Sequence, residues 1–446
     1  MKKVNSKFLR LIVGILLCLA VISFVGACKK SDAGGAGQRI TLYNAGWADM
    51  GELFSPMLPS FQQTHPNVDF EYVQTTFLPH HQALQTSLAA GSGANDVEQI
   101  ETAWIASFRD STALEDMLAP PYNAGQWKDK HINFKWTQGL STDRTRMIAM
   151  PWDMGPLGFF YRADVFEEVG LPTEPEDVAE FMSTWEGFVE VARRVYKPNE
   201  RWLIHDVSEV YNMLFRKRDY FDEQLNFRID RRNDIACLNA CLEIRRNGWD
   251  MQSTGNEATA ARTSGAVISE ITASWGVGTY VRDRLDQSGK WRITTLPDRH
   301  PSSNAGGSFL AIPSQGKNKQ IAYEWIEHVL CTVESGVNQY VLRGFWPTFI
   351  PAWSDAAFLE PHPYFGGQKI GEMFGKIALE LDQPIFMTIM DGNADSLMLT
   401  TINEGLNRNL TPQQIKDTLK DAVEAATAEQ KRQQIDIFHS IGFGNF

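Results

Sequence analysis

The sequence predicts an α/β protein with a largely parallel β-sheet and helices on the faces of that sheet. Its 446 residues are enough for two or three domains, since a domain averages about 150 residues. Apolar residues make up 43% of the chain and charged residues 22%, as in ordinary globular proteins rather than disordered ones. Between residues 40 and 100, strand-like apolar runs alternate with helical patterns in the order β-α-β-α-β, which is typical of a parallel sheet.

The first five elements place three side chains just past strand ends. The strands are expected at residues 40–43, 68–73 and 96–100, and the helices at 52–63 and 80–90. Ligands of such folds bind beyond the carboxyl ends of the strands. Trp47, Glu101 and Trp104 follow such ends, so we expect them near a ligand.

The rest of the chain continues the alternation of strands and helices. Strands are expected at 157–161, 266–271, 291–296 and 308–312, and helices at 163–169, 185–195, 234–246, 276–285 and 320–331. The last helix has the clearest start, because Thr411, Pro412 and Gln414 form the pattern of a capping box with proline in the first turn.

The first 27 residues are typical of an export signal. All of their charged side chains are basic, and an uncharged apolar run follows at residues 11–25. This run is shorter than the roughly 20 residues that cross a bilayer. Residues 25–28 read VGAC and resemble the lipobox of bacterial lipoproteins, which implies that Cys28 becomes the first mature residue and carries acyl chains such as palmitate. We therefore expect a lipoprotein signal peptide at 1–27 and a flexible lipidated tether at 28–38.

Composition and motifs argue against several other functions. The formal net charge of −12 argues against binding a nucleic acid backbone, which requires clustered Lys and Arg. His80 and His81 are adjacent in the sequence, and no nearby side chain completes a metal site. Motifs for dinucleotides, phosphate loops and nucleophile elbows are missing from the sequence. We expect no metal, no cofactor and no catalytic residue.

Three cysteines remain beyond the anchor, and three thiols do not form a disulfide framework. Cys237 and Cys241 lie one helical turn apart on an apolar face, which favours core packing over a metal or redox pair. Whether these two or Cys331 form a disulfide is left open by the sequence.

Seven short stretches, in order and behind a lipobox, resemble the bacterial extracellular solute-binding proteins, family 1, of ABC importers. They are FQQTHPNV at 61–68, LAAGSGANDV at 88–97, FYRADVF at 160–166, GLP at 170–172, TWEGF at 184–188, SW at 274–275 and GGSFLAIP at 306–313. The resemblance runs from about residue 40 to 427. Arg162 departs from the family's usual Asn, and we expect it in a surface ion pair.

This resemblance implies a two-lobed, periplasmic-binding-protein-like fold of type II, with discontinuous lobes joined by crossing hinge segments. Lobe one is expected at 39–152 and 308–344, and lobe two at 153–307 and 345–446. The ligand is expected in the cleft between the lobes, which closes about the hinges.

A sugar presents hydroxyl groups around apolar ring faces, so its site needs aromatic rings and hydrogen-bonding side chains. The alternatives are core packing for each tryptophan, capping or ion pairing for the carboxylates, a hinge turn for the glycines, and a structural role for the arginine. The candidate ligand-binding residues are Trp47, Glu101, Trp104, Trp152, Asp153, Trp275, Gly306, Gly307, Arg343 and Trp346. Trp275 is the leading candidate, because the family's tryptophan there commonly faces ligand.

The expected function is that of a monomeric, lipid-anchored extracytoplasmic protein, not an enzyme, which delivers a carbohydrate or related polyol to ABC permease subunits. A surface glycoside hydrolase is the runner-up, because Glu101 and Asp153 could act as paired carboxylates. A ligand-sensing lipoprotein is the third possibility, and the sequence does not separate it from transport.

Overall fold

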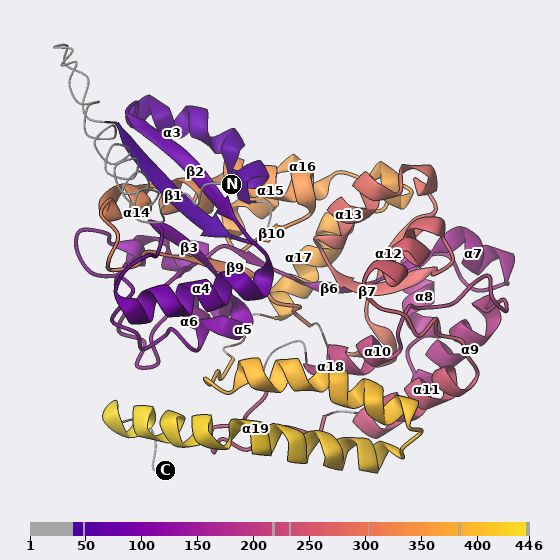
Figure 1. The fold of residues 1–446 in the computed structure, drawn as a ribbon. Helices are drawn as coiled ribbons and strands as arrows, with labels where there is room; N and C mark the ends of the chain where they lie inside the picture. The colour runs from indigo at the N-terminus through magenta and orange to yellow at the C-terminus, as the bar shows by residue number, and fades with distance from the viewer. Residues whose placement is uncertain are drawn as a thin grey trace, which may run out of the picture. The chain divides into compact units, whose positions relative to one another are not determined.

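A five-stranded and a three-stranded β-sheet organise the part of the chain that the structure describes (Figure 1). The structure is a computed structural model and describes residues 39–47, 50–215, 219–231, 233–301, 303–381, 383 and 385–442. The expected signal peptide, the tether and Cys28 lie outside the described residues.

The five-stranded sheet begins with the predicted parallel unit. Strand β1 (Ile40–Gly46) lies parallel to both β2 (Val68–Gln74) and β3 (Val97–Glu101). The connections run through α2 (Met50–Phe54), the short helix η1 (Ser55–Met57) and α3 (Leu58–Thr64), and then through α4 (Phe77–Ala90). The prediction of a parallel β-α-β-α-β unit is therefore confirmed.

Two strands from later in the chain complete this sheet in the opposite direction. Strand β9 (Ser308–Ala311) is antiparallel to β3, and β4 (Met150–Pro151) is antiparallel to β9. A separate two-stranded pairing joins β5 (Asp153–Met154) to β10 (Trp346–Pro347). The ends of these strands bring segments that are far apart in the sequence to one place.

The three-stranded sheet has β6 (Leu157–Arg162) at its centre, antiparallel to β7 (Ser269–Ala273) and β8 (Trp291–Thr294). Strand β7 begins later than the expected residue 266. The reason is that residues 266–268 instead form backbone hydrogen bonds with Trp202, in a short parallel bridge.

Helices make up most of the remaining structure, and the expected ones are present within a few residues. They are α5 (Thr102–Ile105), α6 (Asn133–Gln138), α7 (Ala163–Glu168), α8 (Pro175–Phe181), α9 (Trp185–Val195), α10 (Ser208–Asn212), α11 (Asp234–Arg246), α12 (Gly255–Ser264), α13 (Gly276–Asp283), α14 (Lys319–Leu330), α15 (Val333–Arg343), α16 (Ala356–Leu359), α17 (Ile370–Glu380), α18 (Asp391–Asn407) and α19 (Pro412–Ser440). The capping box predicted at the start of α19 is present, with reciprocal hydrogen bonds between Thr411 and Gln414.

Two large hydrophobic clusters meet at β6, because side chains of a strand alternate between its faces. Phe160 packs into the cluster that contains the helices of the five-stranded sheet, while Phe159 and Tyr161 pack into the cluster formed with α9, α11, α18 and α19. This arrangement buries both faces of the central strand.

The remaining cysteines lie in these cores, as the core hypothesis predicts for Cys237 and Cys241. Both are fully buried in the second cluster, Cys331 is buried in the first, and all three are free thiols. The expected surface ion pair of Arg162 is also present, with Asp164 at 2.6 Å.

Within the described ranges, no helix combines the length and hydropathy needed to cross a membrane. The same part of the chain holds no cluster of three or more potential metal-ligating side chains of the His, Cys, Asp and Glu type.

Candidate ligand-binding site

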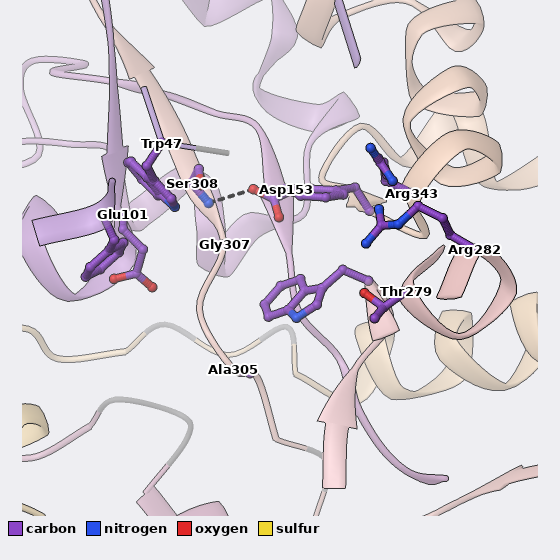
Figure 2. A pocket seen from close by; sticks show the side chains of 12 residues that line it. Trp47, Glu101, Asp153, Thr279, Arg282, Ala305, Gly307, Ser308 and Arg343 are labelled. Atoms are coloured by element: carbon purple, nitrogen blue, oxygen red, sulfur yellow. Dashed lines mark hydrogen bonds between the residues drawn. The ribbon is translucent and has the colours of Figure 1, made fainter. Parts of the chain in front are cut away.

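A pocket of about 360 Å³ lies where ends of the five-stranded sheet face α13 and the end of α15 (Figure 2). Six of the ten candidate residues line it, namely Trp47, Glu101, Asp153, Trp275, Gly307 and Arg343. Six further residues line it that the sequence did not single out, namely Phe77, Thr279, Arg282, Ala305, Ser308 and Phe345. Its size is that of a typical small-molecule site.

Asp153 forms the buried polar centre of the pocket wall. Its side chain is almost fully buried, and the backbone N–H of Ser308 donates a 2.7 Å hydrogen bond to Oδ1. Burial raises the pKa of Asp153 to about 6, while the nearby ammonium group of Lys135 acts in the opposite direction. A carboxylate in this setting changes charge near neutral pH.

Gly307 allows the backbone to pass close to Asp153. Its φ of 102° is unfavourable for other residues, and a Cβ atom there would lie 2.2 Å from the carbonyl oxygen of Asp153. The glycine is therefore required by the tight approach of the two strand ends that form this wall.

Glu101 is held at the N-terminus of α5, where its side chain accepts a hydrogen bond from the N–H of Ala103. Its own N–H donates to Nε2 of His81 at 3.1 Å, while Nδ1 of His81 lies 2.8 Å from the carbonyl oxygen of Phe77. A ring that accepts at Nε2 and donates at Nδ1 is neutral. Burial lowers the pKa of His81 to about 4, which agrees with this neutral form.

Aromatic rings flank the carboxylates on the same side of the pocket. Trp47 lies 5.2 Å from the ring of Phe77 in an edge-to-face arrangement and 4.7 Å from His81. The buried Gln99 links this side to the next strand, because its Oε1 accepts from the N–H of Trp47 and its Nε2 donates to Oγ of Ser308. Trp47 and Ser308 are thus fixed relative to each other.

The opposite side is formed by α13, by the end of α15 and by the residues that follow it. Trp275, Thr279 and Arg282 share one face of a helix and all line the pocket. Phe345 lies 6.2 Å from Trp275 and stacks on Trp152 at 5.8 Å. Arg343 completes this wall.

Four candidate residues are not part of the lining. Trp152 and Trp346 are buried in the hydrophobic core, where Trp152 donates a hydrogen bond to Gln339. Trp104 stacks on His81 at 4.8 Å, and neither residue lines the pocket. Gly306 is next to the lining, and its carbonyl oxygen accepts a hydrogen bond from Asn304.

Two of the unpredicted lining residues could have been found from periodicity. Thr279 and Arg282 lie four and seven residues after Trp275, a spacing that places them on the same face of a helix. Phe345 precedes Trp346, and neighbouring side chains in an extended segment point to opposite sides. The sequence carries no comparable signal for Phe77 or Ala305.

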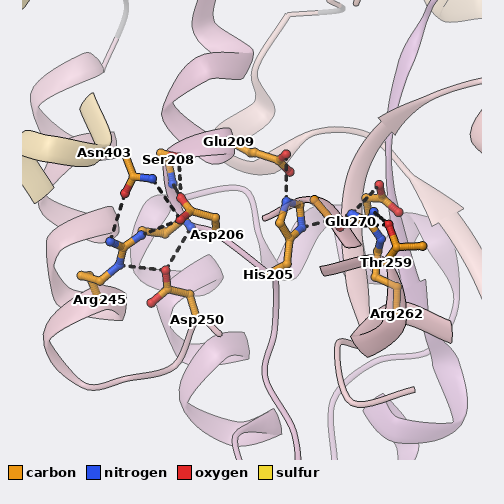
Figure 3. A network of polar contacts seen from close by, with 12 residues as sticks. His205, Asp206, Ser208, Glu209, Arg245, Asp250, Thr259, Arg262, Glu270 and Asn403 are labelled. Atoms are coloured by element: carbon orange, nitrogen blue, oxygen red, sulfur yellow. Dashed lines mark hydrogen bonds and ion pairs between the residues drawn. The ribbon is translucent and has the colours of Figure 1, made fainter. Parts of the chain in front are cut away.

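A second polar cluster lies around Arg245 of α11, outside the lining of this pocket (Figure 3). Its buried guanidinium group is 2.8 Å from Asp250 and 3.2 Å from Asp206, and it donates to Asn403 of α18. These contacts join α11 and α18 to the segment before α10, which is a structural role.

The fold and this pocket define a class of protein: a two-lobed α/β binding protein with its pocket built from segments that are distant in the sequence. The model of the bacterial extracellular solute-binding proteins matches residues 57–360, and the chain belongs to this family.

Curated relatives extend over most of the chain. A lactose-binding protein of Rhizobium radiobacter is 27% identical over 333 residues, which cover 70% of this chain and 75% of the relative. An arabinooligosaccharide-binding protein of Bacillus subtilis (strain 168) is 21% identical over 457 residues, which cover 97% of this chain and all of the relative.

Solved structures show the same two-lobed fold. An extracellular solute-binding protein of family 1 matches with a TM-score of 0.72 and 20% identity, covering 87% of this chain and 99% of that structure. An ABC-transporter-associated binding protein from B. animalis subsp. lactis Bl-04, in complex with beta-1,6-galactobiose, matches with a TM-score of 0.70 and 18% identity, covering 89% and 99%.

Proposed function

We propose that this protein binds a carbohydrate in the pocket between Trp47 and Trp275 and delivers it to the permease of an ABC importer. The observation that carries the proposal is the lining itself: aromatic rings on two sides and the carboxyl groups of Glu101 and Asp153. Aromatic rings stack on sugar rings, and carboxylates accept hydrogen bonds from hydroxyl groups. The names of the two curated relatives, one binding lactose and the other arabinooligosaccharides, support this ligand class.

The proposal includes the site residues and the lobes. The ligand contacts are Trp47, Glu101, Asp153, Trp275 and Arg343, with Gly307 shaping the wall. Lobe one comprises 39–152 and 308–344, and lobe two comprises 153–307 and 345–446. A ligand that contacts both lobes stabilises the closed form relative to the open form.

We further propose that the protein acts as a monomer anchored at the outer side of a membrane by acyl chains on Cys28. The lipobox resemblance of residues 25–28 supports this anchor. A Cys28→Ser variant should move from the membrane fraction to the soluble extracytoplasmic fraction; continued membrane association would contradict the anchor without touching the ligand proposal.

Isothermal titration calorimetry with lactose, galactobiose, arabinooligosaccharides and oligogalacturonates tests the ligand proposal. The expected result is 1:1 binding of at least one neutral or charged saccharide, with the saccharide recovered unchanged. Chromatographic detection of hydrolysis products would instead favour the glycoside hydrolase. A pull-down from membranes with the ligand-loaded protein distinguishes transport from sensing, because recovery of a permease subunit would favour transport.

A further inference from the structure

The charged side chains of the pocket are divided between its two sides (Figure 2). Glu101 and Asp153 come from the ends of the strands of the five-stranded sheet and from β5. Arg282 and Arg343 come from the last turns of α13 and α15. Glu101 therefore lies on one side of the pocket, Asp153 near its centre, and the guanidinium groups on the other side (Figure 2).

Close backbone packing holds the two arginines next to each other. A Cβ atom on Gly278 of α13 would lie 2.5 Å from the carbonyl oxygen of Arg343. A Cβ atom on Gly344, whose φ is 68°, would lie 2.5 Å from the carbonyl oxygen of Ser274. These two glycines let the first turn of α13 touch the end of α15, and both Arg282 and Arg343 line the same side of the pocket.

Each guanidinium group forms an ion pair with an acidic side chain, and in each pair at least the carboxylate is exposed to solvent. Arg282 pairs with Asp283 at 2.7 Å, with side chains 49% and 41% exposed. Arg343 pairs with Glu52, whose side chain is 47% exposed. The exposed pair of Arg282 contributes little to stability, and the half-exposed carboxylate of Glu52 leaves the pair of Arg343 open to solvent on one side.

The nature of the ligand decides whether this wall favours binding. A neutral sugar would displace water from two neighbouring cations and offer only hydroxyl oxygens in return, which compensates poorly for the lost hydration. An anionic group would accept charge-assisted, bidentate hydrogen bonds from arginine, and these are the stronger kind. The wall therefore fits an anion better than a hydroxyl group.

We propose that the preferred ligand is an acidic saccharide, whose anionic group lies against Arg282 and Arg343 while its hydroxyl groups face Glu101 and Asp153. This inference rests on the proposed function of the same pocket. A carboxylate, as in a uronic acid, and a phosphate ester share the required charge, and the experiment separates the two.

Calorimetry with matched saccharides tests the inference. The probes are oligogalacturonates of two and three units, aldouronates from xylan, the methyl esters of both, neutral galactobiose and galactose 6-phosphate. We expect one uronate to bind at least about tenfold more tightly than its methyl ester, which corresponds to about 1.4 kcal/mol. We also expect its affinity to fall as salt is added. If the phosphate ester binds more tightly than any uronate, the preferred ligand is still anionic, but its anionic group is a phosphate rather than a carboxylate.

Variants of the two arginines test whether they cause the preference for an acidic saccharide. Arg282→Gln and Arg343→Gln should each lower affinity for the acid about tenfold or more, and lower affinity for the ester by a clearly smaller factor. Arg193→Gln is the matched control, because Arg193 forms an exposed ion pair with Glu190 and is not part of the lining. Thermal unfolding of each variant shows whether the fold is retained.

The outcomes separate the two proposals. Binding of a neutral saccharide as tight as that of its acidic counterpart, or equal losses for acid and ester in the arginine variants, overturns the acidic ligand and leaves carbohydrate binding intact. Failure of every saccharide, charged or neutral, overturns the proposed function and this inference with it.

Discussion

Asp153 is the pocket residue whose charge state is most sensitive to pH. Burial raises its pKa from 3.8 to about 6. Because the raised pKa means that the folded protein holds the proton more tightly, the contribution of Asp153 to stability is fully present below about pH 3.8 and is lost as the pH rises through about 6. Hydroxyl groups of a ligand donate hydrogen bonds to the ionised carboxylate. Ligand binding therefore favours the ionised form of Asp153, whereas burial favours the protonated form.

Affinity for a saccharide should therefore rise with pH. If only ionised Asp153 binds, the affinity at pH 5 is about tenfold lower than at pH 7. Calorimetry across this range measures the slope, and Asp153→Asn should bind more weakly and lose the dependence. An unchanged slope in that variant would assign the titration to another group.

Trp275 is the residue expected to contribute most to sugar stacking. It lines the pocket and is supported by Phe345. Trp275→Ala should weaken saccharide binding by roughly 2 kcal/mol or more, as for a buried aromatic contact. Trp249→Ala serves as the control, since Trp249 packs against the second hydrophobic cluster and does not line the pocket; similar losses in both variants would point to a general effect on folding.

The sequence identified the segments that reach the pocket more reliably than the individual side chains that line it. Trp152 and Asp153 were both candidates, and the structure places the tryptophan in the core and the carboxylate in the pocket. Trp346 was a candidate and its neighbour Phe345 lines the pocket instead. Which side of an extended segment faces a cleft depends on the pairing of β5 with β10, and those strands are almost 200 residues apart.

Among the elements, the packing of α10, α11 and α18 depends on the buried Arg245 (Figure 3). Replacing Arg245 with Ala leaves the carboxylates of Asp206 and Asp250 buried without their cation, which should cost about 3–5 kcal/mol of unfolding free energy. Its exposed neighbour supplies the control, because Arg246→Ala removes only a surface contact and should change stability by less than about 0.5 kcal/mol. Denaturant unfolding followed by circular dichroism measures both; equal values would contradict the structural role of the cluster.

The close contact between α13 and α15 leads to a prediction about the stability of glycine variants. Gly344→Ala introduces a Cβ atom 2.5 Å from the carbonyl oxygen of Ser274, whereas Gly289→Ala, also at positive φ, meets no atom within 4 Å. Both variants incur the left-handed conformational cost of about 1–2 kcal/mol, and Gly344→Ala should lose at least about 1 kcal/mol more through steric overlap. Thermal unfolding compares them, and matching stabilities would show that the helix ends are not tightly packed.

Elements with local signals were predictable, and those that depend on distant partners were less so. Periodicity and capping residues located α9, α11 and α19 closely. The start of β7 was misplaced because residues 266–268 pair with Trp202, a partner that no local pattern reveals.

The pocket depends on a long-range feature of the fold, because a late segment of the chain adds a strand to the sheet formed by the first segments. Strand β9 follows β3 by about 200 residues and pairs with it, which brings Gly307 and Ser308 to Asp153 and Glu101. The sequence predicted the parallel start of this sheet from short-range alternation. The family resemblance supplied the two-lobed fold, which the comparisons confirm, while the antiparallel pairing itself has no signal in local periodicity.

The measurement that most directly tests carbohydrate binding is the unfolding free energy with and without a saccharide, together with analysis of that saccharide afterwards. We predict that a ligand at a hundredfold excess over its dissociation constant raises the unfolding free energy by about 2.7 kcal/mol and is recovered intact. No stabilisation by any saccharide, or recovery of the saccharide in cleaved form, would contradict the function proposed for this pocket.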